Sequence, residues 1–357
     1  MGVLELLRWR APNPLILLLL LIQWNQQIPH TIDRQFVEVF SGVGEVSRAF
    51  RDVGRRGTSI DLCLDGAFDL TRPSAFGLVL NEILRCKPGS TVLMAPDCRS
   101  LSRMSRHTSG RTYLSPLGNQ GYLFVKIGNI LSARTALLAF LCSFCGLRWV
   151  IEQPEGTFLP QLPRYQWLFG VLKVFATTMY MGVFGSGSPK KHRLLSNDPA
   201  FLEKIHDKAG FMSRVDQAKC DTKLVHRYID KNGKRRCTGL KKELKESANY
   251  PPAFGDFIAS IAVEMEAVPV PMNMHLDESF PIDLTDLELF RRFCLPIGDP
   301  WKDVPGIKCF FWQSGYPTNH TRIDFPQVRQ LVSCGIALGL PMGCCGVFRP
   351  CKIYASA

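Results

Sequence analysis

Three segments of the chain place chemically capable side chains at or just after the ends of short apolar runs. A glycine-rich turn, Ser41–Gly44, follows one run, while Cys98 and Glu152 follow two later ones. Runs of this length and composition are typical of buried strands. Because parallel strands present their carboxyl ends at one edge of a sheet, where ligands bind, we expect the three segments to contribute to one site.

The turn after Phe40 has the composition of a ligand-binding strand-to-helix connection. Glycines let the backbone approach a ligand closely, and the following helix offers its first N–H groups. A tight connection with no ligand fits the same residues. Two acids strengthen the binding interpretation: Asp61 ends the next strand, where such sheets bind a ribose, and Asp69 follows. The full dinucleotide fingerprint fails at Ser47, so a nucleoside-bearing cofactor is favoured without specifying a nicotinamide.

Cys98 stands at the end of a predicted strand beside basic residues that favour a thiolate, as a nucleophile requires. A buried structural thiol is the alternative. The arginines that follow have no acid among them, which fits either a loop that meets phosphates or a solvated loop. They are Arg99, Arg103, Arg106 and Arg111.

Glu152 is the carboxylate at the end of the run 148–151. A carboxylate buried there without a partner costs free energy, so we expect it to bind or titrate something; a cap for the next helix is the alternative. Glu155 lies past a proline and is the weaker candidate.

The elements that must position these residues alternate between strand and helix. Strands are predicted at 36–40, 58–61, 91–95 and 148–151, with helices up to residue 50 and at 74–85 and 118–145. This alternation predicts an α/β fold with a mostly parallel sheet and helices on both faces. A further helix at 252–265 is expected to pack back onto the sheet.

Composition limits the class of protein. The chain has 357 residues, 46% of them hydrophobic, which excludes disorder throughout, and its net charge of +12 favours a polyanionic partner. Half of that excess lies in residues 201–250, with 13 basic and 7 acidic residues (13 − 7 = +6), around a hairpin predicted at 225–234. This basic insertion is the second candidate surface for nucleic acid.

The thirteen cysteines are scattered and odd in number, which indicates free thiols of a reducing compartment. No metal site is expected, and a conceivable zinc set in the basic insertion lacks a zinc-finger spacing. That set is His206, Cys220, His226 and Cys237.

The two ends of the chain differ from the middle. Residues 1–30 carry the apolar run Leu15–Ile22 behind Arg8 and Arg10, which fits a targeting segment or an extension and is too short to span a bilayer. No stable membrane partner is expected. Residues 267–357 show no periodicity and form a C-terminal extension to which we assign no fold.

The order of the motifs resembles that of the cytosine-5 DNA methyltransferases. Those enzymes have a Phe-x-Gly-x-Gly turn, a Pro-Cys loop, a Glu-Asn strand end, a basic strand after Gly-x-Pro-Gln and a closing Asn-x-x-Pro-Pro. The corresponding segments here are Phe40–Gly44, Pro96–Cys98 with Ser102, Ile151–Pro154, Gly187–Leu195 and Asn249–Phe254. The resemblance covers roughly residues 35–265.

The resemblance implies a Rossmann-like, S-adenosylmethionine-dependent methyltransferase domain at 31–266, with the basic insertion at about 196–246 in the place of the target-recognition region. Cys98 would attack C6 of cytosine, Glu152 would hold the N3/N4 edge and Arg193 would assist at the base. The base would be flipped out of the duplex. The residues implied for the cofactor are Phe40, Ser41, Gly42, Gly44, Asp61, Asp69 and Pro96.

The implied partner is DNA, with RNA as an alternative, and the implied location is intracellular, most simply the nucleus, or an organelle if the N-terminal run is a targeting signal. The residues expected to contact nucleic acid are Arg99, Arg103, Arg106, Lys234, Arg235 and Arg236.

Departures from the family pattern bear on activity more than on fold. Asp97 precedes the nucleophile where the family has proline, Gln153–Pro154 replaces Asn-Val, and the basic strand lacks a clean Gln-x-Arg-x-Arg. A methyltransferase-fold protein that binds nucleic acid without catalysis is therefore a second hypothesis.

Overall fold

The structure is a computed structural model that describes residue 6, residues 11–24 and 29–266, and residue 270. The described residues form two compact units. The first, here called the sheet unit, is drawn from Asp33–Asp65 and from Cys86 onward; the second is drawn from the residues up to Ile32 and from Gly66–Arg85. The predicted C-terminal extension, 267–357, lies outside the described residues except for residue 270.

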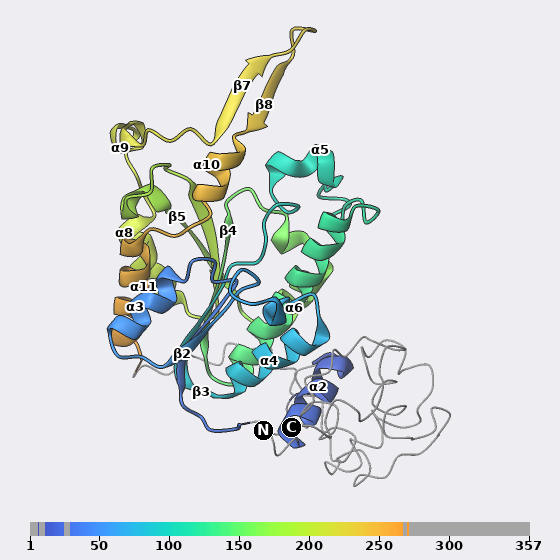
Figure 1. Cartoon of the computed structure of the whole chain (residues 1–357), viewed down its shortest axis with the longest axis vertical. Coiled ribbons are helices and arrows are strands. Elements are labelled where there is room, and N and C mark those ends of the chain that lie inside the picture. The colour runs from blue at the N-terminus through green and yellow to red at the C-terminus, as the bar shows by residue number, and fades with distance from the viewer. Residues whose placement is uncertain (1–5, 7–10, 25–28, 267–269, 271–357) are drawn as a thin grey trace, which may run out of the picture. The chain divides into compact units, whose positions relative to one another are not determined.

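In the described part of the sheet unit, six strands form one sheet in the order β2-β1-β3-β4-β6-β5 (Figure 1). The first four strands are parallel to one another. Strand β6 is antiparallel to both of its neighbours, so β5 has the same direction as the first four strands. The sheet is therefore mostly parallel, as predicted. The strands are β1 (Arg34–Val39), β2 (Gly57–Ile60), β3 (Cys86–Met94), β4 (Arg148–Pro154), β5 (Phe175–Tyr180) and β6 (Lys191–Ser196).

The order of the strands reverses direction at β1. The chain moves outward from β1 to β2 and then returns past β1 to β3. Crevices beside such a switch point are where open α/β sheets bind ligands. The register aligns the carboxyl ends there, since Val39 pairs with both Ile60 and Met94, and Met94 pairs with Ile151.

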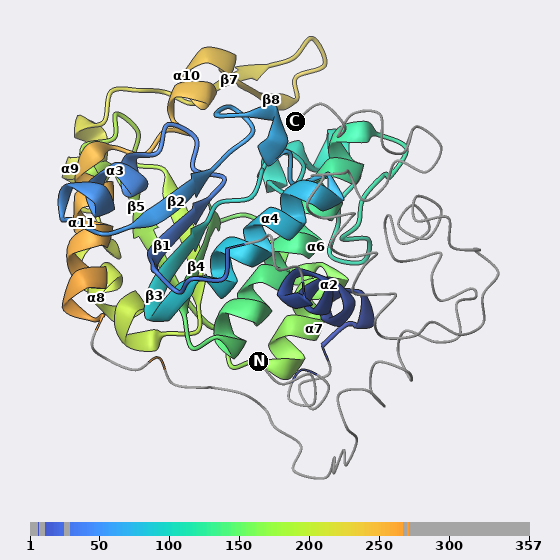
Figure 2. The same ribbon diagram turned by 60° about the horizontal axis from the view of Figure 1, so that its bottom comes forward.

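Helices cover both faces of the sheet (Figures 1 and 2). One face carries α3 (Glu45–Asp52), α8 (Pro199–Ala209) and α11 (Pro252–Glu264), and the rings of Phe36 and Phe50 stack beneath them at 4.7 Å. The other face carries α6 (Leu123–Phe144) and α7 (Pro163–Val171), with the indole N–H of Trp149 donating to Ser143 Oγ at 2.7 Å. Both apolar faces of the sheet are thereby buried.

Helix α6 begins five residues later than the predicted 118–145 segment. Gly118 has φ +64°, and the Asn119 side chain accepts the backbone N–H of Gly121, so a turn occupies the positions before the helix. By length and composition alone α6 could cross a membrane, and most of its apolar stretch is buried inside the protein. That burial explains its apolar sequence.

A buried ion pair ties the amino-terminal edge of the sheet to the helices. Arg148 Nε lies 2.7 Å from Asp198 Oδ2, and the same guanidinium donates to the carbonyls of Gly89 and Met265. Asp198 also caps α8 by accepting the Phe201 N–H. These bonds join β4, α8 and the end of α11.

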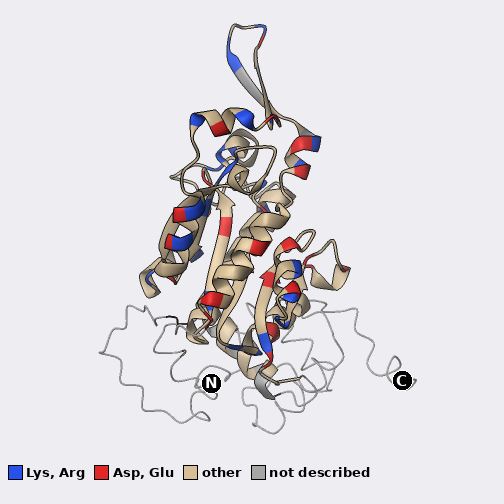
Figure 3. Cartoon of the chain, turned by 90° about the vertical axis from the view of Figure 1, so that its left-hand side faces the viewer, with Lys and Arg blue, Asp and Glu red and all other residues tan. Residues whose placement is uncertain are grey.

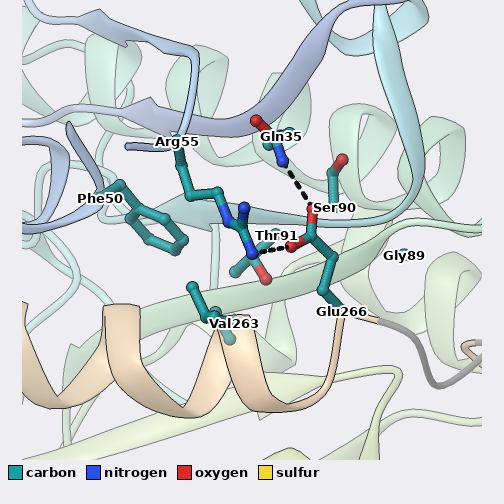
Figure 4. A pocket seen from close by; sticks show the side chains of 9 residues that line it. Gln35, Phe50, Arg55, Gly89, Ser90, Thr91, Val263 and Glu266 are labelled. Atoms are coloured by element: carbon teal, nitrogen blue, oxygen red, sulfur yellow. Dashed lines mark hydrogen bonds and ion pairs between the residues drawn. The ribbon is translucent and has the colours of Figure 1, made fainter. Parts of the chain in front are cut away.

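Glu266 makes a second connection at the same edge. Its carboxylate lies between Gln35, which donates to it at 2.8 Å, and Arg55, which pairs with it at 2.6 Å (Figure 4). The cavity beside these residues has a volume of only about 10 Å³. It is too small for a ligand, so we assign these contacts a structural role.

The basic insertion differs in part from its predicted bounds of 196–246. Helix α8, inside those bounds, packs on the sheet through Phe201, Leu202 and Ile205 and belongs to the core. The part that leaves the core contains α9 (Arg214–Lys219), the hairpin β7 (Val225–Ile229) and β8 (Arg235–Gly239), and α10 (Lys241–Glu246). The predicted Asn-Gly hairpin is confirmed and projects from the rest of the unit (Figure 1).

The second unit contains α2 (Asn13–Trp24), the short η1 (Gly66–Phe68) and α4 (Pro73–Leu84), with α2 and α4 in contact. The predicted helix at 74–85 is thus confirmed, although its residues group with the N-terminal segment instead of with the sheet unit.

Candidate functional site

The turn after β1 has an unusual backbone. Phe40, Gly42 and Gly44 have φ values of +62°, +55° and +76°, and Phe40 is the one non-glycine residue with positive φ in the described part of the chain. A bulky residue in this region costs about 1 to 3 kcal/mol, so the conformation persists only where its surroundings impose it. Here the carbonyl of Ile60 accepts the N–H groups of both Phe40, at 2.7 Å, and Ser41, at 3.2 Å.

Asp61 lies against this turn, as expected from its position at the end of β2. Its Oδ2 accepts the Gly42 N–H at 2.9 Å, and its Oδ1 accepts the Cys63 N–H at 2.8 Å. The positions where a Cβ would stand on Gly42 and Gly44 face open space. The turn is therefore fixed by an acid on one side and accessible on the other.

Glu38 is a buried acid that sequence reasoning missed. It lies on β1, and its Oε2 accepts both the N–H and the hydroxyl of Ser47, at the position that breaks the dinucleotide fingerprint. Burial raises the pKa of Glu38 to about 7, although the two hydrogen bonds from Ser47 oppose the rise. The sequence signal that could have identified Glu38 is its position as a charged residue between the apolar Val37 and Val39.

Cys98 is partly buried in a loop joined to β4. The amide of Gln153 donates to the Pro96 carbonyl, and the N–H groups of Leu101 and Ser102 each donate to the Cys98 carbonyl at 3.0 Å. Burial, and then the charge of Glu152, raise the pKa of Cys98 to about 11, while the charge of Lys190 opposes the rise.

The expected stabilisation of a Cys98 thiolate by the following arginines is therefore wrong for the protein without ligand. Arg99 pairs with Asp97 at 2.7 Å instead. An arginine held by a neighbouring carboxylate offers the thiol little net positive charge.

Glu152 is buried on β4 and hydrogen-bonded on both oxygens. Its Oε1 contacts His192 Nδ1, and its Oε2 accepts the hydroxyl of Tyr250 at 2.8 Å. Burial alone would raise the pKa of Glu152, but His192, Lys190 and Tyr250 together bring it below the ordinary value. The carboxylate does not act as a helix cap and is held ionised.

The register of β6 places His192 in the site and Arg193 outside it. Glu152 pairs with Leu194, and Gln153 pairs with Arg193. Because side chains alternate along a strand, His192 and Leu194 share the face of Glu152, whereas Arg193 lies on the opposite face. The structure therefore does not bring Arg193 together with Cys98 and Glu152.

Lys190 and Tyr250 also reach this region without having been predicted individually. Lys190 Nζ donates to the carbonyl of Ser247 at 3.1 Å, and Tyr250 stands in the Asn-Tyr-Pro-Pro segment before α11. The sequence signal for both is their place in the segments Gly187–Leu195 and Asn249–Phe254.

The basic loop after Cys98 is organised by an arginine that does not face solvent. Arg111 is fully buried and donates to Ser100 Oγ at 2.9 Å and to the Pro116 carbonyl, and burial lowers its pKa to about 10. A phosphate-binding role for Arg111 is therefore wrong. Arg103 and Arg106 are exposed, and the Arg103 guanidinium lies over the Tyr113 ring.

The hairpin, which projects from the rest of the sheet unit, carries several basic residues (Figure 3). Lys234 and Arg235 are exposed, and the backbone of Arg236 is part of β8. Asp230, the one acid between residues 222 and 242, uses Oδ1 to accept the N–H groups of Asn232 and Lys234. The outward charge of the hairpin is therefore strongly positive.

Asp69 belongs to the second unit, where its carboxylate accepts the N–H and hydroxyl of Thr71 and pairs with Arg72. These local contacts stabilise the turn that contains Asp69 and precedes α4.

At the carboxyl end of β5, a cavity of about 640 Å³ lies between the Gly182–Gly187 turn and the segment 208–221. In the part of the chain that the structure describes, no group of three or more His, Cys, Asp or Glu side chains has a metal-binding arrangement.

No protein-family model matches the chain, and no curated protein matches its sequence significantly.

Proposed function

We propose that the protein is a Rossmann-like, S-adenosylmethionine-dependent methyltransferase that acts on C5 of cytosine in DNA. The observation that carries this proposal is the meeting of a partly buried thiol and a buried, ionised carboxylate at the carboxyl ends of neighbouring parallel strands. These are Cys98 after β3 and Glu152 on β4, next to the turn that follows β1.

The residues around that turn suit S-adenosylmethionine. Open space adjoins Gly42 and Gly44, and Asp61 provides carboxylate oxygens at the place where a ribose would be bound. The buried Ser41 Oγ and Glu38 Oε1 have no protein partner among the described residues. Phe40 and Pro96 would border the same position. When bound, this cofactor supplies an electrophilic methyl group.

The chemistry assigned to the protein's own residues starts at C6 of the base. As the Cys98 sulfur bonds to C6, the thiol gives up its proton and N3 of the ring gains one, which converts C5 into an enamine-like nucleophile able to accept the methyl group. Glu152 binds the N3/N4 edge and stabilises the activated ring. After methylation, loss of the proton from C5 and cleavage of the C6–S bond restore the aromatic ring and the thiol.

Nucleic acid as the partner is supported by the distribution of charge. The segment 98–151 contains no Asp or Glu, and its exposed arginines include Arg103 and Arg106. The hairpin adds Lys234, Arg235 and Arg236. Phosphate contacts from such residues position a duplex, and the target base must then be flipped to reach Cys98. A DNA substrate would place the protein in the nucleus or in a DNA-containing organelle.

A second candidate function is favoured by one specific observation. With a pKa of about 11, the Cys98 thiol is protonated at neutral pH. A protein that binds nucleic acid through the same surfaces without methyl transfer would show the same protonated thiol.

One experiment separates these functions. The full chain is incubated with S-adenosylmethionine and duplex DNA containing 5-fluorocytosine, and the covalent adduct is detected by denaturing electrophoresis and mass spectrometry. We expect an adduct with the wild type and none with Cys98→Ala. Binding without an adduct on any sequence would favour the non-catalytic protein, and an adduct only with the matching RNA would reassign the substrate.

A further inference from the structure

The ladder between β4 and β6 brings an imidazole to the carboxylate beside the nucleophile. Pro154 pairs with His192, and Glu152 pairs with Leu194, so His192 and Glu152 are diagonal neighbours on one face. His192 is 2% exposed, and its Nδ1 contacts Glu152 Oε1. The contact is therefore shielded from solvent on both sides.

The two nitrogens of His192 have different surroundings. Nδ1 has the carboxylate as its partner, while Nε2 is buried and has no partner among the described residues. A buried N–H group without an acceptor costs more free energy than a buried nitrogen lone pair without a donor. In the neutral ring the proton therefore lies on Nδ1, where the Glu152 carboxylate accepts it. The imidazole then acts as a donor that fixes Glu152.

The carboxylate is in turn coupled to the thiol. Met94, the last residue of β3, pairs with Ile151 of β4, and the Gln153 amide donates to the carbonyl of Pro96, two residues before Cys98. These contacts hold the nucleophile loop against the strand that carries Glu152. The charge of Glu152 disfavours the thiolate of Cys98.

We propose that His192 is a positioning residue that sets the reactivity of Cys98 indirectly, by keeping the Glu152 carboxylate ionised and fixed beside the thiol. The inference rests on the proposed function only in assigning the nucleophile to Cys98. Other charged or titratable groups face this cluster, namely Tyr250, Lys190, Asp97 and, from β1, Glu38. On β5 the residue paired with His192 is the apolar Met179.

The direction of the effect follows from the contacts. Without the Nδ1–H donor, burial raises the pKa of Glu152 and the carboxyl becomes neutral more readily. Loss of that negative charge lowers the pKa of Cys98, so removing a residue that lies beyond Glu152 should make the thiol more reactive.

The test uses neither cofactor nor nucleic acid. The full chain is treated with iodoacetamide across a series of pH values, and labelling of the Cys98 peptide is followed by mass spectrometry, since Cys63 is exposed and also reacts. For His192→Leu we expect labelling of Cys98 at about pH 8 to be on the order of tenfold faster than in the wild type, which corresponds to a pKa lower by about one unit.

Three further variants decide how the effect is transmitted. Glu152→Gln should accelerate labelling to a similar extent, and His192→Leu combined with Glu152→Gln should add nothing, because both act through one charge. His192→Gln, whose amide can still donate, should label more like the wild type. Arg193→Leu, adjacent in sequence but on the other face, is the matched control and should leave the rate unchanged.

Unchanged labelling in a folded His192→Leu protein, or additive effects in the double variant, would overturn the proposal. If the leucine variant does not fold, His192→Asn replaces it, since asparagine is too short to reach the carboxylate. Because the readout is alkylation, loss of the adduct with 5-fluorocytosine DNA would reject the proposed function without affecting this result.

Discussion

The hydroxyl of Tyr250 donates to Oε2 of Glu152 at 2.8 Å, across 98 positions of sequence. The segment that leads into α11 therefore supplies one of the two donors that hold the carboxylate at the end region of β4. The fold has to be complete before this residue has its final environment.

Tyr250→Phe removes that donor with little change of shape. A hydrogen bond to a charged group contributes about 1.5 to 3 kcal/mol, so we expect the free energy of unfolding at neutral pH to fall by roughly that amount. Because the pKa of Glu152 is lower in the folded than in the unfolded protein, its ionised carboxylate stabilises the fold at pH values above the unfolded-state pKa. This stabilisation is lost as the pH falls through the folded-state pKa. In the variant that loss should begin at a higher pH, as urea denaturation across a pH series would show. If the free energy of unfolding of the variant and of the wild type fell at the same acidic pH, Tyr250 would not affect the charge of Glu152.

Glu38→Gln should remove a pH dependence of stability. The pKa of Glu38 is about 7 in the folded protein and 4.5 as a reference, so the fold prefers the neutral acid. Stability is then fully present below about pH 4.5 and declines as the pH rises through 7, by roughly 3 kcal/mol in total. The glutamine variant should lack this decline while keeping an oxygen for Ser47. If the free energy of unfolding had the same pH dependence in the wild type and in Glu38→Gln, the raised pKa of Glu38 would be contradicted.

Met104→Ala should slow the reaction on paired DNA. The Met104 side chain is 63% exposed. The backbone before it is bound to the loops that follow β3 and β4, because the Ser102 N–H donates to the Cys98 carbonyl and the Arg103 N–H donates to the Gly156 carbonyl. An exposed apolar side chain so close to the nucleophile is suited to occupy the position that a flipped base leaves.

The reaction of Met104→Ala with 5-fluorocytosine should therefore be slower, on the order of tenfold, in a matched duplex and unchanged where the target base is unpaired. Leu114→Ala, at a side chain that is 99% exposed in the same loop, is the control and should affect neither substrate. Equal slowing on both substrates would indicate general damage to the loop.

Lys234→Ala and Arg235→Ala should weaken DNA binding through loss of phosphate contacts. Each contact releases counterions, so the slope of log K against log salt should become less steep by about 0.9 per residue. Fluorescence anisotropy at several salt concentrations measures this slope. Lys87→Ala, at the start of β3 near the opposite edge of the sheet, provides a matched control. A slope that does not change in the hairpin variants would remove the hairpin from the binding surface.

Much of the fold followed from local sequence signals. The apolar runs that precede Cys98 and Glu152 form adjacent strands because β-branched and apolar residues bounded by polar turns have few alternatives in a buried sheet. The Asn-Gly pair specified the hairpin by its turn chemistry. Strand β5 was missed because its edge position leaves it half exposed, and it lacks the continuous apolar run of the central strands.

The side chains on β6 could not be assigned from sequence for a physical reason. A shift of one residue in register moves every side chain to the other face, so the choice between His192 and Arg193 depends on where the strand begins and with which residue it pairs. Arg111 shows a related limit. Its charge predicted an exposed side chain, whereas two acceptors in the loop, Ser100 and Pro116, and a third in the first turn of α6, Val125, allow its burial.

The reversed direction of β6 has a consequence for how the protein could diversify. The chain leaves β6 at Ser196, on the edge away from Cys98, and α8 then carries it back along the sheet before the hairpin begins. The hairpin is thus joined to the core on one side through a helix anchored by Phe201 and Ile205, and on the other side through α10, which leads directly to Tyr250, the donor to Glu152. Under the proposed function, changes to the segment between α8 and the hairpin would leave Cys98 and Glu152 in place, whereas changes after α10 would reach Glu152 through Tyr250. Target preference could therefore evolve separately from the chemistry on one side of this module only.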